Sequence, residues 1–417
     1  QLDRAPLDNA EAQRALAALR TVSPTASGTT IDADSPLSFI ANAITFAAMP
    51  GGNTTAARLP VLIGGMLLVL APALWRRYLD PLPPLIMSAM LAISPVAVLA
   101  SRTSSPVIWT MLLAVVAPWL ALRYLELRDT RWAVAATVAF AAMAFLAEPA
   151  GYLALLALGF GVLFAVLTDV DDETDSAPAI RAVLREWPWR DGAIAAVITV
   201  LAVGTLAYWV PSGLGTIGNL VYDGLRGFGV RSAEVPVAFP LWVALRYETG
   251  LIILGLFACY QAIREGGFFE RVLVGWLLAG LVWSVGYADA SAAHALWIVL
   301  PLTVLVALSV TNWLTERVVA LWDVPSWTIP GHAVITFGLW CAVGLSVVLL
   351  GKRLLIDLPG GVTQLGELLT MLSKGVYSRN LSDPATVYIQ DQPVWEYVLG
   401  YIPVSYTHLR AHETKAN

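Results

Sequence analysis

Charged residues are scarce in this sequence. Only 13% of its 417 residues are Asp, Glu, Lys or Arg, whereas 58% are hydrophobic, and the mean hydropathy is +0.69. This balance excludes an ordinary soluble domain, in which about a quarter of the residues are charged. The net charge of -5 argues against a nucleic-acid partner, because such partners require a basic surface.

Cysteine and histidine are also rare, with two and four copies respectively. Cys259 and Cys341 fall within apolar stretches, so no disulfide is expected between them. His408 and His412 lie in residues 403–417, which resemble the translation of a sequencing adapter and are predicted to be an artefact. The sequence has no Cys/His spacing typical of zinc sites and no Gly-rich phosphate loop.

Long apolar runs, in contrast, are abundant. A helix that crosses a bilayer needs about 20 mostly apolar residues, because the hydrocarbon layer is about 30 Å thick. In lipid, backbone polar groups must be paired within the segment, so each run is predicted to be helical. About ten stretches meet or nearly meet the length test: residues 59–75, 82–100, 106–122, 132–147, 151–167, 193–210, 249–263, 272–287, 294–314 and 333–350. The sequence therefore predicts an all-α polytopic membrane protein.

Arginines predict the orientation of these spans. Counted along the chain, the loops on one side carry the arginines at positions 76, 77, 123, 128, 131, 181, 185, 190, 264 and 271. Cytoplasmic loops are enriched in Lys and Arg, so this side is predicted to be cytoplasmic. The protein is therefore expected to be a multi-pass protein of the cell membrane, with the opposite loops extracytoplasmic.

The chain is divided into four parts and is expected to be a fragment truncated at both ends. The parts are a first extracytoplasmic loop (1–58), a transmembrane bundle (59–350), the start of a small α/β extracytoplasmic domain (351–402) and the adapter-like segment (403–417). Residues 36–49 are apolar but too short for a span, so an interfacial helix is expected there, and a second near 217–228.

Short motifs on the predicted outer face resemble those of a known family. They are Pro6-Leu7 with Glu11-Ala12, Asp32 to Leu37, Asn42 to Phe46, Ala57-Arg58-Leu59, Ser94-Pro95 with Ser101-Arg102, and Val387-Tyr388-Ile389-Gln390. Together they resemble the GT-C superfamily of integral-membrane glycosyltransferases, which includes protein O-mannosyltransferases and aminoarabinose transferases. Within it, the chain is most similar to flippase-associated mannosyltransferase-like membrane proteins. The resemblance implies a GT-C-like bundle, a polyprenyl-phosphate sugar donor, and a catalytic acid in the first outer loop.

That chemistry requires a carboxylate to deprotonate the acceptor hydroxyl and a cation to take up charge on the departing phosphate. Asp8 and Glu11 are three residues apart, so on a helix they share one face. We predict that they are catalytic; the alternative is a solvated or helix-capping pair. The family pattern is an adjacent Asp-Glu, and Ala10 stands at the expected Asp position, which supports the location of the site better than its activity.

Two arginines are predicted to bind the phosphate. Arg102 directly follows a predicted span, where a guanidinium can bind a phosphate through two hydrogen bonds. Arg58 is placed similarly at the start of the first span. The alternative for both is an arginine that reaches to lipid headgroups at the membrane edge.

The remaining substrate-binding candidates are acidic residues and one histidine. Asp34 precedes Ser35-Pro36, where a turn-forming aspartate is the simpler interpretation. Glu148 lies at a tight outer turn, where it is either wet or lines the site. Asp289 and His294 flank the start of a predicted span, and the alternative for His294 is a helix-start or interfacial residue. Ala290 stands where the family places a basic residue.

The leading interpretation is a glycosyltransferase that moves a sugar from a polyprenyl-phosphate donor to an extracytoplasmic hydroxyl. Participation of a divalent cation stays open, as do the sugar and the acceptor. The alternative is a non-catalytic membrane partner of a lipid-linked-sugar flippase or glycan-assembly complex, which the alanines at positions 10 and 290 favour. A secondary transporter is disfavoured, because the sequence has no evident inverted repeat and its charges lie at the ends of the spans.

Overall fold

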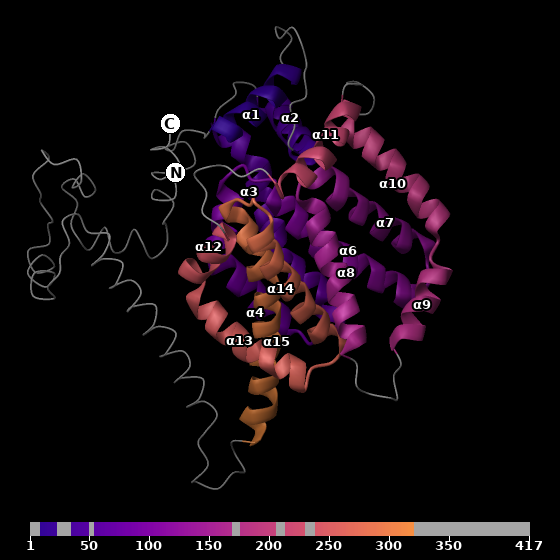
Figure 1. Ribbon diagram of the computed structural model, residues 1–417, viewed down its shortest axis with the longest axis vertical. Helices are drawn as coiled ribbons and strands as arrows, with labels where there is room; N and C mark the ends of the chain where they lie inside the picture. Colours follow the sequence, from indigo (N-terminus) through magenta and orange to yellow (C-terminus); the bar gives the residue numbers. More distant parts are fainter. Residues whose placement is uncertain are drawn as a thin grey trace, which may run out of the picture. The chain divides into compact units, whose positions relative to one another are not determined.

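The computed structural model describes residues 9–22, 35–49, 54–168, 176–205, 213–229 and 238–320. Within these ranges it contains helices and the turns between them, which confirms the all-α prediction (Figure 1). The chain divides into two units, Gln1–Val319 and Ala320–Asn417, and the described helices belong to the first. The predicted span at 333–350, the C-terminal domain and the adapter-like segment lie outside the described residues.

The order of the helices follows the predicted apolar runs. Their bounds are α1 (Asn9–Val22), α2 (Pro36–Ala48), α3 (Thr54–Leu70), η1 (Ala71–Arg77), α4 (Leu82–Ile93), α5 (Pro95–Arg102), α6 (Val107–Leu127), α7 (Thr130–Ala142), η2 (Met143–Ala147), α8 (Gly151–Leu167), α9 (Ser176–Glu186), α10 (Trp189–Gly204), α11 (Gly213–Arg226), α12 (Phe239–Tyr247), α13 (Thr249–Arg264), α14 (Phe268–Gly286), η3 (Ala292–Ala295) and α15 (Leu296–Ala320). The elements η1 and η3 are 3-10 helices, and η2 is a π-helix that continues α7.

Several helices of the described part are long and apolar enough to cross a membrane. Five continuous helical segments meet this test of length and composition: Thr54–Arg77, Val107–Leu127, Thr130–Ala147, Phe268–Gly286 and Ala292–Leu314. Two bent pairs, α4 with α5 and α12 with α13, also pass the test when each pair is counted as one span, which gives up to seven. The shorter apolar helix α8 coincides with the span predicted at 151–167, and α10 covers the first part of the span predicted at 193–210, whose last residues lie outside the described ones. These helices confirm a polytopic membrane fold.

Two spans are interrupted, which the sequence analysis did not predict. The stretch 82–100 was expected to be one helix, but α4 and α5 meet at Ser94 with a bend of 63°. Pro95 causes this break, because it lacks an N–H and disfavours a helical conformation at the residue before it. The second break lies at Glu248, where α12 and α13 meet at 99°. The nine-residue α12 is too short to be recognised as a span, and it falls between the spans predicted at 193–210 and 249–263.

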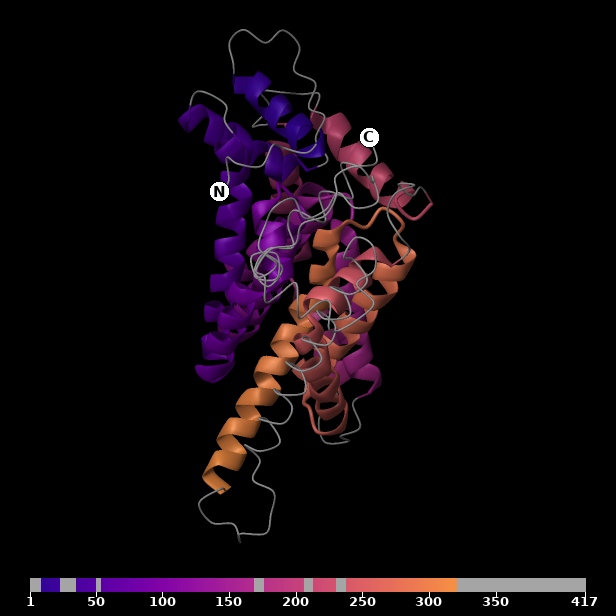
Figure 2. The same ribbon diagram turned by 90° about the vertical axis from the view of Figure 1, so that its left-hand side faces the viewer.

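Both expected interfacial segments are helical. Residues 36–49 form α2, whose N-cap Ser35 accepts a hydrogen bond from the Ser38 amide, and whose first residue is Pro36, as is common at helix starts. Residues 217–228 largely form α11. Both views show α1, α2 and α11 at the same end of the bundle, which we call the α1 end (Figures 1 and 2). Their position at a membrane surface stays a prediction.

The helix α15 forms the centre of the bundle, and α8 packs against α14 beside it. The buried share of the apolar window of Ala292–Leu314 is 83%, against 33–50% for the other four continuous spans. The contact between α8 and α14 depends on glycines, because a Cβ added at Gly161 would lie 2.4 Å from the carbonyl oxygen of Val272. Close approach of backbones at small residues is how helices associate in membranes.

This close approach predicts different effects for two single substitutions in α8. Gly161→Val should lower the free energy of unfolding by about 1–3 kcal/mol, because the two helices must move apart. Gly159→Val is the matched control, since no atom lies within 4 Å of a Cβ at Gly159. Thermal unfolding of the purified variants in detergent measures the difference. Equal unfolding temperatures for both variants would contradict the packing described.

Candidate functional site

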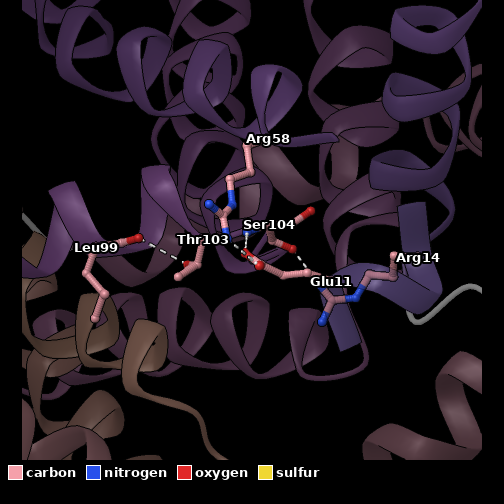
Figure 3. A network of polar contacts seen from close by, with 6 residues as sticks. All are labelled: Glu11, Arg14, Arg58, Leu99, Thr103 and Ser104. Atoms are coloured by element: carbon pink, nitrogen blue, oxygen red, sulfur yellow. Dashed lines mark hydrogen bonds and ion pairs between the residues drawn. The ribbon is translucent and has the colours of Figure 1, made fainter. Parts of the chain in front are cut away.

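A buried ion pair connects three elements at the α1 end. Glu11, in the first turn of α1, is 3% exposed, and Arg58, near the start of α3, is 2% exposed. The Glu11 Oε2 atom accepts a hydrogen bond from Arg58 Nη2 at 2.7 Å, and its Oε1 atom accepts one from the Ser104 backbone amide at 2.7 Å. Figure 3 shows the carboxylate between these two donors. Glu11 therefore joins α1 to α3 and to the residues that follow α5.

Neighbouring contacts hold this network in place. Arg14, one turn after Glu11 in α1, donates to the carbonyl oxygen of Ser104 (Figure 3). Thr103 donates from its hydroxyl to the Leu99 carbonyl oxygen at 3.1 Å and so completes the last turn of α5. An apolar cluster is formed by residues of α1, α2 and α3: Ala15, Ala18, Phe39, Ala43, Phe46, Ala56 and Ala57. In such apolar surroundings the attraction between two paired charges is strong, and a buried charge without its partner destabilises the fold.

Arg102 lies beside this network and is differently placed from Arg58. It is the last residue of α5, two positions before Ser104, and it is half-buried. Within the part of the chain that the structure describes, Arg102 has no hydrogen-bond or ion-pair partner. Its guanidinium is therefore available to an anion at the α1 end, whereas the guanidinium of Arg58 already binds Glu11.

A second buried pair forms between Glu148 and His294. Glu148 follows η2 and is 1% exposed, so it is buried rather than wet. His294 lies in η3, and its Nδ1 atom accepts a hydrogen bond from the Ser291 amide at 2.8 Å. The ring proton of neutral His294 is therefore on Nε2, which lies 3.3 Å from Glu148 Oε2. His294 Nε2 and the other carboxylate oxygen, Oε1, are both buried without a hydrogen-bond partner in the described structure.

The helix α11 covers this second pair from the α1 end. Tyr152, in α8, donates from its hydroxyl to the Gly224 carbonyl oxygen at 2.9 Å, and the Asp289 amide donates to the Gly227 carbonyl oxygen at 3.1 Å. Tyr287 lies under the same segment, 4% exposed, with its ring 6.3 Å from that of His294. Burial raises the pKa of the Tyr287 hydroxyl, and the charges of Asp289 and Glu148 raise this pKa further. Tyr287 is therefore protonated near neutral pH.

The structure groups some of the sequence candidates and separates others. It brings Glu11 to Arg58, and Glu148 to His294, while Arg102 adjoins the first pair. The side chain of Asp289 is exposed, unlike those of the buried pairs. Two further candidates, at positions 8 and 34, lie outside the described residues.

Sequence reasoning missed two residues that complete these arrangements. Ser104 contributes only its backbone amide, for which the sequence carries no signal. Glu248 is a buried carboxylate at the break between α12 and α13, where its Oε1 atom accepts a hydrogen bond from Ser94. A lone acidic residue between two apolar helices could have indicated it, because ionisable residues in spans are rarely without a role. No group of three or more metal-ligating side chains occurs among the described residues.

Charges at the opposite end of the spans form a separate set. Arg58 and Arg77 stand at the two ends of one helical segment, Thr54–Arg77. Arg77 and Arg123 both pair with Glu126, and Arg128 pairs with Glu186 at 2.8 Å. The arginine-rich loops predicted to share one side thus contact one another, and we call this the arginine end.

Comparison with known proteins supports the fold. No protein-family model and no curated protein matches the sequence. Two solved structures of ArnT from Cupriavidus metallidurans, one apo and one bound to undecaprenyl phosphate, match at 16% identity with TM-scores of 0.52 and 0.55. The match covers 84% of this chain and 67–68% of ArnT. The archaeal oligosaccharyltransferase AglB from Archaeoglobus fulgidus, in complex with an inhibitory peptide and a dolichol-phosphate, matches at 16% identity and a TM-score of 0.51.

The alignment with AglB covers 82% of this chain and 51% of AglB, so the chain spans about half of that protein and about two thirds of ArnT. At this level of identity the likeness concerns the fold. The chain has the GT-C fold that its sequence motifs resemble.

The tautomer assigned to His294 predicts how two substitutions differ. His294→Ala should lower the free energy of unfolding by about 1–3 kcal/mol, because the Ser291 amide then loses its acceptor and Glu148 loses the buried ring beside it. His294→Gln should lose less, since its amide supplies both a donor and an acceptor. Asp289→Ala, in the exposed loop beside it, is the control. Thermal unfolding in detergent measures all three, and equal losses for Ala and Gln at position 294 would refute the assignment.

Proposed function

We propose that this chain belongs to a membrane glycosyltransferase that takes a sugar from a polyprenyl-phosphate donor and passes it to an acceptor hydroxyl outside the cytoplasm. One observation carries the proposal. A carboxylate from the first loop, Glu11, is buried against Arg58 at the α1 end of a GT-C-like fold, and Arg102 ends α5 two residues before Ser104, whose amide binds the same carboxylate. A carboxylate and a cation next to each other are what transfer from a lipid phosphate requires.

Arg102 is assigned to the phosphate. A guanidinium binds a phosphate through two parallel N–H donors and cannot lose its charge at neutral pH. Arg102 is half-buried and has no partner in the described structure, so its donors are available. Negative charge that develops on the departing phosphate is stabilised there. Arg58, bound to Glu11, orients the carboxylate and contributes its positive charge to the same site.

Glu11, with Asp8 as the second candidate, is assigned to the acceptor hydroxyl. The two carboxylate oxygens of Glu11 accept hydrogen bonds from Arg58 and from the Ser104 amide, which hold the carboxylate in one orientation. Because its geometry is fixed by α3 and α5, no reorganisation is needed before the hydroxyl binds. Asp8 precedes Glu11 by three residues in the sequence.

Glu148 and His294 are assigned to the sugar or the acceptor. The unpartnered Oε1 atom of Glu148 is a strong acceptor for a hydroxyl group, and the unpartnered Nε2 of His294, 3.3 Å from Glu148 Oε2, is a donor beside it. Asn42, on α2, has a fully buried side-chain amide that is also without a partner among the described residues. Buried polar groups of this kind normally bind water or a ligand. A mannosyl or other hexosyl group, as the sequence resemblance implies, is the narrower form of the proposal.

A second function is favoured by the composition of the site itself. Ala10 replaces the Asp of the family pattern, and both oxygens of Glu11 already have protein partners. These features suit a non-catalytic partner of a lipid-linked-sugar flippase or glycan-assembly complex, in which the Glu11 pair only holds the fold.

A transfer assay separates the two functions. Membranes that contain the full-length protein are supplied with labelled sugars on polyprenyl-phosphate carriers. The double variant Asp8→Asn with Glu11→Gln should transfer at least about 100-fold less sugar than wild type, because general-base catalysis is lost. Glu186→Gln, which removes one charge of an exposed ion pair at the arginine end, is the control and should retain activity.

Two results of this assay would count against the assignment. Undiminished transfer by the double variant would remove Asp8 and Glu11 from the reaction. Absence of transfer by folded wild-type protein across the donor panel would favour the non-catalytic partner.

The proposal also requires the α1 end to face away from the cytoplasm. In a protein with both native cysteines replaced by serine, Asp289→Cys should react with a membrane-impermeant maleimide in intact cells. Glu186→Cys should react only after the membrane is permeabilised, because the arginine end is expected to be cytoplasmic. Both positions are exposed, so access alone decides the result. The reverse labelling pattern would show that the α1 end faces the cytoplasm, which contradicts the proposal.

A further inference from the structure

The two interrupted spans are joined to each other at their breaks. Glu248 is 7% exposed and separates α12 from α13. Its Oε1 atom accepts a hydrogen bond from the Ser94 hydroxyl at 2.5 Å and another from the Val96 amide at 3.2 Å. Ser94 is the residue at which α4 ends and α5 begins. One carboxylate therefore connects the two bends of 63° and 99°.

Glu248 caps α5 rather than its own helix. The first amides of a helix have no partner within it, and α13 receives no side-chain cap from Glu248. In α5 the Ala97 amide donates to the Ser94 side chain at 3.1 Å, and the Val96 amide donates to Glu248. Two amides at the start of α5 are therefore hydrogen-bonded to side chains. One of these side chains, Glu248, is more than a hundred residues later in the sequence.

The helix α5 is fixed by a carboxylate at each end. Glu248 binds its first turn, and Glu11 binds the Ser104 amide just after its last residue, Arg102. With eight residues, α5 is about 12 Å long, so its direction is set by these two contacts. Ser101 packs closely on Gly65 of α3, because a Cβ added at Gly65 would lie 2.3 Å from the Cβ of Ser101. This contact fixes which face of α5 packs on α3.

A carboxylate inside a membrane bundle is an expensive way to cap a helix. Burial of an ionisable group is opposed by its loss of hydration, and Ser94 already supplies an ordinary N-cap. Glu248 satisfies the Val96 amide, which Ser94 leaves unpaired, and at the same time fixes the start of α5 against the break between α12 and α13. This contact defines one orientation of α5, and hence of the arginine at its end.

We propose that Glu248 is a positioning residue, which sets the orientation of α5 and thereby places Arg102 against the phosphate of a polyprenyl-phosphate ligand. This inference rests on the proposed function. Glu248 does not touch the ligand; it acts through Ser94, Val96 and the length of α5.

The test compares affinity for a lipid phosphate with affinity for the same lipid without phosphate. Purified full-length protein in lipid nanodiscs is titrated with undecaprenyl phosphate and, separately, with undecaprenol. Wild type should bind the phosphate more tightly. Glu248→Ala should lower this preference at least about tenfold, because the hydrogen bonds that orient α5 are lost, and leave undecaprenol binding unchanged. Glu248→Gln should stay within about twofold of wild type, since its carbonyl oxygen can accept both hydrogen bonds.

Three further variants make the outcome decisive. Glu265→Ala, at the exposed far end of α13, should behave as wild type. Ser94→Ala removes one of the two donors to Glu248 and should lower the preference even if Glu248→Ala does not fold. An unchanged preference in folded Glu248→Ala or Ser94→Ala overturns the inference, and so does a Gln variant that is as weak as Ala. If wild type and Arg102→Gln both bind undecaprenyl phosphate no more tightly than undecaprenol, the assignment of Arg102 in the proposed function is overturned, and the inference with it.

Discussion

The arrangement of the α1 end depends on one requirement: a carboxylate buried among apolar helices must have partners. Glu11 meets it with the guanidinium of Arg58 and the amide of Ser104, at 2.7 Å each. Each partner belongs to a different element, so the carboxylate determines how α1, α3 and α5 meet. Removal of any one partner leaves a charge in a medium that solvates it poorly. The position of Arg102, two residues from Ser104, follows from the same contacts.

The interruptions of the helices obey the same requirement. A break in a spanning helix exposes backbone groups that lipid cannot satisfy, so it is tolerated only where protein supplies partners. At Ser94 the partners are the serine itself and Glu248. At the end of η2, the buried Glu148 is paired with His294 of another irregular element, η3. The irregular segments of this bundle are therefore also its polar segments, which is where a ligand with a phosphate and hydroxyl groups would find partners.

Local properties of the sequence were enough to predict the helices. Apolar runs of sufficient length can only be helical in lipid, so the described spans fall where they were expected, and the outer motifs placed Glu11, Arg58 and Arg102 at one end. The contacts between them could not be predicted. Glu11 and Arg58 are 47 residues apart, and Ser94 and Glu248 are 154 apart, so no local pattern records that they meet. The break at Pro95 could have been predicted from the Ser-Pro pair, whereas α12 was too short to distinguish from a loop.

The central claim is that Glu11 and Arg58 form a buried pair in the folded protein. A double-mutant cycle measures this most directly, with Glu11→Gln, Arg58→Gln and the double variant unfolded by a denaturing detergent. A coupled buried pair should give a coupling energy of about 2 kcal/mol or more, so that the double variant is far more stable than the sum of the single losses implies. Additive losses would show that the two side chains do not depend on each other, and would contradict the arrangement on which the site is built.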